Sequence, residues 1–404
     1  MKTKLPLFGW ALYDFANTIF SAVVLTFYFP LYLTSLSQRN VHLGVATTSA
    51  MVLAGVVVPW LGALSDRTGK TKTYLVVTTL LCIVFTMLLS FFTFLPFLVG
   101  SFLLACFFFH ASLVFYFALL PVVAKPPRQG FASGFGTALG YFGVLVAIPI
   151  AYEVDAFFGR RFVFWVAGVL FFIFSLPLFF WVPERKVENP FPPSLRLFKD
   201  QWVGVFRTLG KLRREPPLLF FFLGNFFVME AMNTVIFWMI LYLAHVFHLP
   251  QFYLVATFLA LNLSAFLFGF LAGFLTDSWG AEKTLLAAVG AFFLTLFGLA
   301  LSSSYEIFLV LSLTGGAFGL AGNWTAARKR VLELVPNEEV GEYFGLYNLT
   351  TKISVTSSLI FSILADRFGF RVALLSQLLP SGLGLMFLCL AEFNRRSASR
   401  YPSS

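Results

Sequence analysis

Long apolar stretches alternate with short polar connections along the whole chain. Each stretch holds about twenty residues or more, the length that a helix rising about 1.5 Å per residue needs to cross a bilayer core. The pattern gives six stretches, one longer polar segment, and six further stretches. We therefore predict an all-α membrane protein with twelve transmembrane helices, over residues 7–36, 44–65, 73–93, 96–123, 131–153, 162–182, 217–247, 251–275, 283–302, 305–328, 343–365 and 371–392.

The composition agrees with a membrane protein and excludes a soluble one. Hydrophobic residues make up 59% of the chain, charged residues 11%, and the mean hydropathy is +0.86. The three cysteines have no paired spacing, so neither a disulfide framework nor a metal site is expected. Because no phosphate-binding loop and no nucleophile constellation occurs, we predict no enzyme activity, no catalytic residue and no cofactor.

Two polar landmarks occur twice, which indicates an internal duplication. An acidic residue followed by Asn and Thr begins at Asp14 and again at Glu230, 216 residues later. The pattern G-x-x-x-D-x-x-G begins at Gly62 and again at Gly273, 211 residues later. The nearly equal spacings predict two pseudo-symmetric six-helix bundles. Their expected bounds are 1–182 and 217–404, the second including a short tail, with a linker at 183–216.

The basic residues predict how the chain is oriented. Of the 28 Lys and Arg residues, Lys352 alone falls inside a predicted span, and 22 of the other 27 lie on one side of the membrane. Cytoplasmic loops carry such an excess, so we predict a multi-pass protein of an inner or plasma membrane with both termini in the cytoplasm. The net charge of +10 therefore reflects topology, and no nucleic-acid partner is expected. Five basic residues fall on the outer side: Arg39, Arg160, Arg161, Arg367 and Arg371.

The linker itself contains a basic stretch with interspersed apolar residues. Trp202 and Phe206 lie among the Lys and Arg residues between Arg196 and Arg214. This mixture is typical of a helix that lies on the inner leaflet of a membrane. A solvated linker helix fits the same pattern, and the sequence leaves both alternatives open.

Two carboxylates lie inside apolar spans, where a charge is expected mainly if a transport pathway or a partner requires it. Asp14 and Asn17 share one helical face, and so do Glu230 and Asn233. We interpret these four residues as part of a substrate or proton pathway. For Asp14 there is also a plain structural alternative, because it lies near the end of its span and could serve as a cap or ion-pair partner there.

Lys352 and Asn348 lie one turn apart in the eleventh predicted span and are further pathway candidates. A lysine far from either interface needs a carboxylate to remain charged. We therefore expect Lys352 to be coupled to Glu230, directly or through a bound solute. The alternative is a shifted span boundary, from which the lysine reaches the interface.

The segment from Gly62 to Lys72 resembles the G-x-L-x-D-R-x-G-R-K loop motif of the major facilitator superfamily. The resemblance implies two six-helix bundles, a central cavity, alternating access, and a conformational latch at the motif. The second copy replaces the Arg by Ser278 and one basic position by Glu282, so we expect the first latch to be stronger. The expected latch residues are Gly62, Asp66, Arg67, Gly69, Lys70, Gly273, Asp277 and Gly280.

Residues 9–18 are similar to the W-x-x-Y-D-x-A-N-[ST] opening of the vacuolar-effluxer-like branch of that superfamily. Characterised eukaryotic members of this branch export amino acids from the vacuole, which implies an amino-acid-like solute here. We predict a monomeric secondary transporter of a small polar or zwitterionic solute, acting in export, with proton coupling through Asp14 or Glu230. The alternatives are a drug or amphiphile exporter of the same fold, and a membrane sensor that does not transport.

Overall fold

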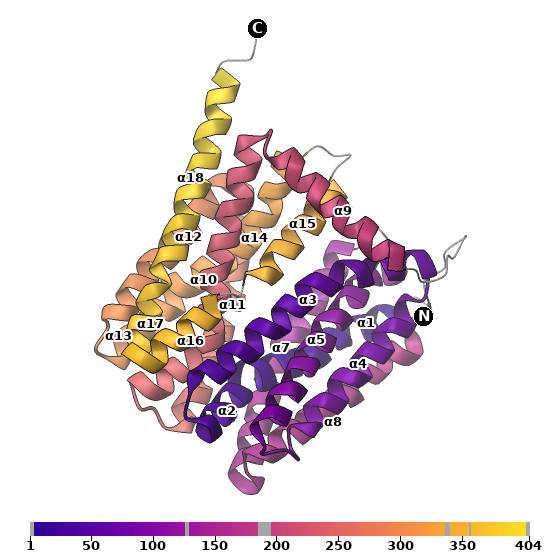
Figure 1. Ribbon diagram of the computed structural model, residues 1–404, viewed down its shortest axis with the longest axis vertical. Helices are drawn as coiled ribbons and strands as arrows, with labels where there is room; N and C mark the ends of the chain where they lie inside the picture. Colours follow the sequence, from indigo (N-terminus) through magenta and orange to yellow (C-terminus); the bar gives the residue numbers. More distant parts are fainter. Residues whose placement is uncertain (1–3, 126–128, 185–194, 336–339, 355–356, 401–404) are drawn as a thin grey trace. The chain divides into compact units, whose positions relative to one another are not determined.

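The computed structural model describes residues 4–125, 129–184, 195–335, 340–354 and 357–400. Every regular element within these ranges is helical. The residues cluster into two compact units, Met1–Gln201 and Trp202–Ser404 (Figure 1). The division lies inside helix α9 (Leu195–Leu212), within the linker that the sequence predicts between the bundles.

The first unit contains the helices of the first six predicted spans. The first span joins three consecutive segments, of which the middle one, η1, is wound as a π-helix. Such wide turns are uncommon and occur often at functional sites. The helices are α1 (Lys4–Thr18), η1 (Ile19–Tyr28), α2 (Phe29–Ser37), α3 (Asn40–Thr68), α4 (Thr71–Leu88), α5 (Leu95–Ala118), α6 (Leu120–Val123), α7 (Gln129–Phe158) and α8 (Arg160–Trp181).

The second unit repeats this series with more interruptions. Its tenth, eleventh and twelfth spans are each divided into shorter helical segments. The helices are α10 (Pro216–Val246), α11 (Gln251–Ser278), α12 (Ala281–Leu301), α13 (Tyr305–Leu311), η3 (Ser312–Gly316), α14 (Ala317–Leu334), α15 (Val340–Ile353), α16 (Ser357–Phe368), α17 (Phe370–Ser376) and α18 (Leu378–Arg400).

The twelve-helix architecture predicted from the sequence is confirmed. Eleven helices or joined helical segments of the described chain are long and apolar enough to cross a membrane. In the eleventh predicted span, 343–365, α15 ends at Ile353 and α16 begins at Ser357, and residues 355–356 between them lie outside the described ranges.

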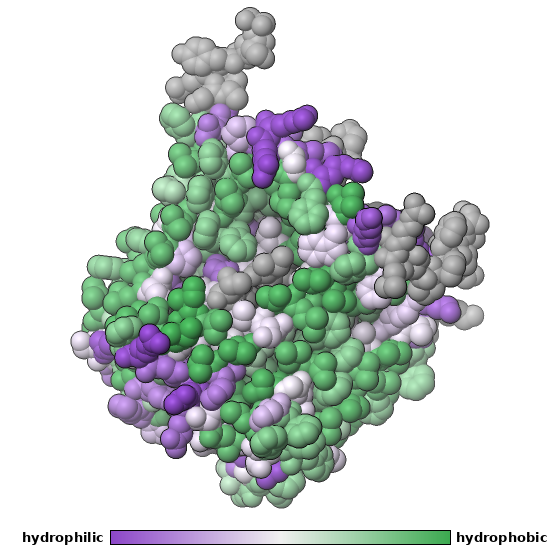
Figure 2. All heavy atoms as spheres, in the orientation of Figure 1, coloured by the Kyte–Doolittle hydropathy of each residue, from purple (hydrophilic) through white to green (hydrophobic). Residues whose placement is uncertain are grey.

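The outer surfaces of both units are apolar. Large side chains such as Phe157, Phe180 and Phe274 are exposed on helices that are otherwise hydrophobic. Figure 2 shows hydrophobic side chains over most of the face in view. Exposed apolar surface of this extent marks contact with a membrane or a partner, and helices of this length and composition favour lipid.

Glycines allow close packing of the helices within each unit. A Cβ atom added at Gly140 of α7 would lie 3.0 Å from the Thr18 hydroxyl oxygen on α1. A Cβ atom added at Gly384 of α18 would lie 2.5 Å from Cγ2 of Val228 on α10. Small residues bring helix backbones together in membranes, where the hydrophobic effect does not drive helix association. The first helix of each unit is therefore seated against a glycine of a later helix.

Two glycines between helices reveal the duplication in the backbone itself. Gly159 precedes α8 with φ 87° and ψ 158°, and Gly369 precedes α17 with φ 86° and ψ 165°. They are 210 residues apart, close to the spacing of the sequence landmarks. This region of φ and ψ is essentially restricted to glycine. The second half of the chain thus repeats a turn of the first half with nearly the same φ and ψ at its glycine.

We expect Gly369→Ala to destabilise the second unit by about 1–3 kcal/mol, because an L side chain is strained at that backbone conformation. The matched control is Gly269→Ala, since Gly269 lies inside α11 and, as at Gly369, an added Cβ meets nothing within 4 Å. Thermal unfolding of the purified protein in detergent should show a lower Tm for Gly369→Ala alone. Equal Tm values for the two variants would contradict the strain argument.

Candidate functional site

The carboxylate of Asp14 and the amide of Asn17 lie together on α1. Asn17 Nδ2 donates a hydrogen bond of 3.0 Å to Asp14 Oδ1. The hydroxyl of Thr18 donates to the backbone oxygen of Asp14 over 2.7 Å. Asn17 is buried and Asp14 is half-buried. The structure therefore brings the two residues into one polar pair inside an apolar span.

The second oxygen of Asp14 faces α7 and the end of α5. A Cβ atom built on Gly136 would lie 3.2 Å from Asp14 Oδ2 and 3.1 Å from the Tyr116 hydroxyl. The carboxylate and the phenol therefore lie close to one another beside the bare backbone of Gly136. The Tyr116 hydroxyl is buried and has no hydrogen-bond partner within the described part of the chain. A side chain at position 136 would therefore crowd the oxygen atoms of Asp14 and Tyr116, whereas glycine does not.

The other residues of this motif have structural roles that the sequence does not reveal. The Trp10 ring stacks on Tyr116 with centroids 4.4 Å apart, and its Nε1 donates to the backbone oxygen of Tyr116 over 3.0 Å. The Tyr13 hydroxyl shares a hydrogen bond of 2.6 Å with Thr79 of α4. Trp10 and Tyr13, in the turn that precedes Asp14, therefore join α1 to α5 and α4.

Glu230 and Asn233 of α10 bind the backbone of the divided eleventh span. The carboxylate of Glu230, which is 4% exposed, accepts a hydrogen bond from the backbone N–H of Ser357, the first residue of α16. Asn233 Nδ2 lies 3.2 Å from the backbone oxygens of both Thr351 and Ser354. The positive end of the α16 dipole attracts the carboxylate. Side chains of α10 thus bind backbone groups at the end of α15 and at the start of α16.

Ser357 and Gln377, neither of which the sequence singled out, extend this contact into a buried network. The Ser357 hydroxyl lies 3.0 Å from the Thr234 hydroxyl and 3.2 Å from Gln377 Oε1. Gln377 stands between α17 and α18 and donates from Nε2 to the Ser376 hydroxyl over 3.0 Å. Both residues are uncharged and lie in apolar spans. They form these hydrogen bonds at helix ends, since Ser357 begins α16 and Gln377 lies between α17 and α18.

The other two pathway candidates lie on α15. Asn348 and Lys352 belong to its backbone, and their side chains lie outside the described residues. The coupling between Lys352 and Glu230 therefore stays a prediction. What the structure adds is that Glu230 already binds the backbone of the same span.

The first motif copy ends α3 and begins α4. Gly69 ends α3 with φ 68°, while Arg67 and Lys70 are exposed. The side chain of Asp66 lies outside the described residues, and Gly62 lies on α3 beside Val114. Glu184, which follows α8, accepts from the backbone N–H groups of Lys72 over 2.6 Å and Thr73 over 3.1 Å. It thereby binds the N–H groups that the first turn of α4 leaves unpaired.

The second motif copy has a different set of partners. Gly273 lies on α11 with open space at its Cβ position, and Gly280 precedes α12 with φ 92°. Asp277 pairs with Lys329 of α14 through a contact of 2.8 Å between Oδ1 and Nζ. Both side chains of this pair are well exposed, so the pair contributes little to stability.

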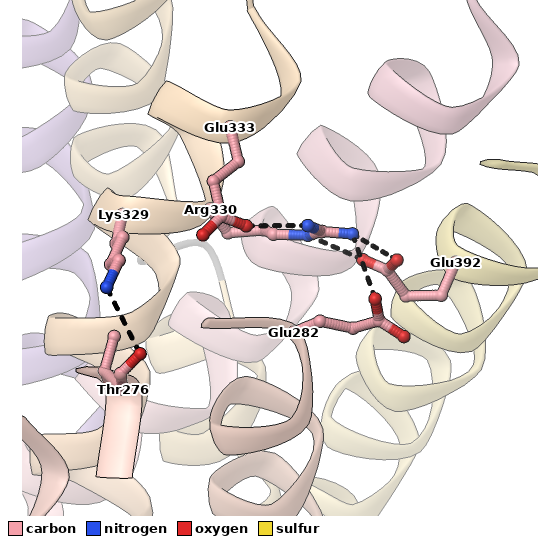
Figure 3. A network of polar contacts seen from close by, with 6 residues as sticks. All are labelled: Thr276, Glu282, Lys329, Arg330, Glu333 and Glu392. Atoms are coloured by element: carbon pink, nitrogen blue, oxygen red, sulfur yellow. Dashed lines mark hydrogen bonds and ion pairs between the residues drawn. The ribbon is translucent and has the colours of Figure 1, made fainter. Parts of the chain in front are cut away.

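Next to Lys329, the buried Arg330 binds three carboxylates (Figure 3). Its guanidinium donates to Glu392 of α18 from both Nε and Nη2, and to Glu333 over 2.7 Å from Nη1. Glu282 of α12 lies 3.5 Å from Nη2. The Arg330 side chain is only 2% exposed. One planar fork therefore ties α12, α14 and α18 together at one end of the second unit.

This cluster corrects one sequence interpretation. The charge pattern assigned Arg330 to a cytoplasmic loop, but α14 extends to Leu334 and the residue is buried. Glu282 stands where the motif has a basic residue, and its carboxylate is one of the partners of Arg330. The second copy thus has ion pairs of its own, which the comparison of the two motifs alone does not reveal.

Comparison with known families gives a match over most of the chain. The model of the Major Facilitator Superfamily matches residues 7–356. An uncharacterised transporter of this type, YxiO of Bacillus subtilis, is 22% identical over 94% of this chain and 93% of its own. Autophagy-related protein 22-1 of Neosartorya fischeri is 25% identical over 66% of this chain and 49% of its own length.

A solved structure has the same fold. It is a bacterial homologue of the human lysosomal transporter Spinster in an inward-facing, unoccupied conformation. Its TM-score is 0.73, with 13% sequence identity over 96% of both chains. At this identity the likeness concerns the fold alone.

Arg330→Met should lower stability by about 3–5 kcal/mol, because it leaves three carboxylates together without their buried cation. Lys329→Met, at the adjacent position, should cost at most about 1 kcal/mol, since its ion pair is exposed. Thermal unfolding of both variants in the same detergent compares them directly. A Tm loss for Lys329→Met as large as that for Arg330→Met would show that burial does not set the strength of these ion pairs.

Proposed function

The chain belongs to the Major Facilitator Superfamily, and we propose that within this family of secondary transporters it moves a small zwitterionic, amino-acid-like solute out of the cytoplasm. We further propose that it acts as a monomer with both termini in the cytoplasm. The preceding resemblance of residues 9–18 to the vacuolar-effluxer-like branch supports the class of solute. The excess of Lys and Arg on one side supports the orientation.

The observation that carries the proposal is a pair of polar groups repeated in spans one and seven. Asp14 and Asn17 form a hydrogen-bonded carboxylate and amide, and Glu230 and Asn233 hold the same positions in the second unit. An ammonium group is recognised by carboxylate and carbonyl oxygens, and a carboxylate group by N–H donors and bases. Asp14 is our candidate partner for an ammonium group, and Lys352, in the second unit, is our candidate partner for a carboxylate.

Of the two carboxylates, Asp14 is the better candidate for proton coupling. Glu230 is bound to the N-terminus of α16, where the backbone N–H and the helix dipole hold it in place. Asp14 is half-buried and keeps Oδ2 beside the bare backbone of Gly136 and the Tyr116 hydroxyl. We assign Glu230 to positioning of the eleventh span, and Asp14 to binding and releasing a proton.

The two motif copies would act as latches that stabilise one state of alternating access. Glu184 binds the start of α4 beside the first copy, and Lys329 pairs with Asp277 of the second. Each copy thus has a charged partner within its own unit. In the first copy Arg67 and Lys70 are exposed.

Transport by purified protein in proteoliposomes tests the function directly. Neutral, cationic and anionic radiolabelled amino acids would be tested beside an amphiphilic cationic dye, each with and without an imposed pH gradient. We expect gradient-dependent movement of an amino acid. Movement of the dye alone would favour the drug-exporter alternative, and movement of no probe would favour a sensor.

Asp14→Asn should abolish accumulation driven by the pH gradient, because the amide cannot bind and release a proton. Exchange of solute at equal concentrations on both sides should remain, since the amide oxygen still accepts hydrogen bonds. Glu153→Gln is the matched control, because Glu153 is an exposed carboxylate of α7 in the same unit. Accumulation by Asp14→Asn equal to that of the control would exclude Asp14 as the proton site.

Asp66→Asn should shift the population toward inward-open states by weakening the first latch. Asp277→Asn should have a smaller effect, because its pair with Lys329 is exposed. Accessibility of single introduced cysteines to a membrane-impermeant reagent from each side measures the shift. Unchanged accessibility in Asp66→Asn would remove this residue from the latch.

A further inference from the structure

Helix α9, in the segment between the two sets of spans, has an apolar ridge that begins at the half-buried Trp202 and continues with two exposed side chains. Trp202, Phe206 and Leu209 follow one another at intervals of four and three residues, so they share one side of the helix. Phe206 is 66% exposed and Leu209 is 40% exposed, and the Trp202 ring lies 6.0 Å from that of Phe206. An apolar ridge of this kind on a polar linker is the feature that requires an explanation.

Basic side chains lie on α9 and directly after its end. Lys199 and Arg207 of α9 and Arg213 and Arg214 after it are all exposed, and Asp200 is the one acidic residue of α9. Figure 2 shows strongly hydrophilic and hydrophobic atoms next to each other where Figure 1 draws α9. Aromatic and aliphatic side chains next to long basic ones are typical of helices that lie in the interface of a membrane.

The short connection from α9 to α10 keeps α9 close to a bilayer. α9 ends at Leu212 and the membrane-spanning helix α10 begins at Pro216. Three residues lie between them, and the four steps from Leu212 to Pro216 span at most about 14 Å when fully extended. Arg213 and Arg214 therefore lie within that distance of the start of a span. By the distribution of basic residues this is the cytoplasmic side, whose leaflet carries anionic lipids.

We propose that α9 binds the anionic surface of the bilayer through the ridge of Trp202, Phe206 and Leu209 and the basic residues on α9 and directly after its end. The apolar side chains enter the interface, and the basic side chains bind lipid phosphates. The occupant of this surface is the lipid headgroup region, because the tether is short and the exposed charge is positive. This inference concerns the linker and does not depend on which solute is transported.

The expected strength follows from the number of basic residues. Each Lys or Arg near an anionic leaflet favours the bound state about fivefold. Removing three of them should lower the ratio of bound to unbound helix on the order of 100-fold. A high salt concentration should weaken the binding in the same direction, since it screens exposed charges.

Spin labels on two faces of α9 measure the binding in the full chain. Gly210 is exposed and lies one turn after Phe206, and an added Cβ meets nothing within 4 Å. Gly204 also has open space but lies about 120° away around the helix. A label is attached to a cysteine at one site or the other, after Cys82, Cys106 and Cys389 are replaced. The protein is then placed in nanodiscs of phosphatidylcholine, with or without phosphatidylglycerol.

We expect the label at 210 to become more accessible to oxygen and less accessible to a water-soluble nickel complex when phosphatidylglycerol is present. The label at 204 should remain accessible to nickel. Replacing Arg207, Arg213 and Arg214 by Gln should reverse the change at 210. The matched control replaces three other exposed basic residues, Lys125, Lys283 and Arg395, by Gln and should preserve it.

Three results would overturn the proposal. The first is equal nickel accessibility of the label at 210 in both lipid mixtures. The second is an equal effect of the control substitutions. The third is a label at 210 that is shielded from oxygen and nickel alike, which would mean that protein covers the ridge. If the α9 variant fails to fold, salt titration of the labelled parent chain still decides, because lipid binding through charge must weaken with salt.

Discussion

The need to satisfy every backbone N–H and C=O group within a bilayer governs this structure. Continuous helices satisfy these groups by themselves, whereas an interrupted helix needs outside partners. In the eleventh span α15 ends at Ile353 and α16 begins at Ser357, and α10 supplies partners at both ends, Glu230 at Ser357 and Asn233 at Thr351 and Ser354. The polar residues of the seventh span therefore pair backbone groups that these two helix ends leave available. A pathway residue in this position would have to keep that support while it binds a solute.

Buried charge is governed by the same requirement. Arg330 is buried because three carboxylates surround its guanidinium, and these carboxylates are held together because the guanidinium is there. Lys329, the preceding residue, needs no such arrangement because it reaches an exposed aspartate. The two adjacent residues thus differ in role because Arg330 is buried and Lys329 is exposed. The planar fork of arginine can bind several carboxylates at once, which a lysine ammonium does less well.

The sequence predicted the features that depend on local pattern. The length of the apolar stretches predicts the spans, and the repeated motifs predict the duplication. Each of these signals is a pattern within a short run of neighbouring residues. The Arg330 cluster could not be predicted this way, since its partners Glu282 and Glu392 are 48 and 62 residues away in sequence. Ser357 and Gln377 carry no charge to attract notice, and their role comes from helix interruptions whose positions propensity indicates only weakly. Within the candidate site, the pairing of Asp14 with Asn17 follows from helical spacing, while the approach of Tyr116 depends on tertiary packing.

The two units keep the same turns but use their charges differently. Gly159 and Gly369 have nearly the same backbone angles, so the path of the chain is repeated. Glu184 and Glu392 also stand at nearly the repeat distance, each late in its unit. Glu184 binds the backbone at the start of α4, whereas Glu392 binds the side chain of Arg330. Backbone geometry restricts a turn to glycine, but a carboxylate can bind any donor within reach. The chemistry of the two halves can therefore diverge on a repeated backbone.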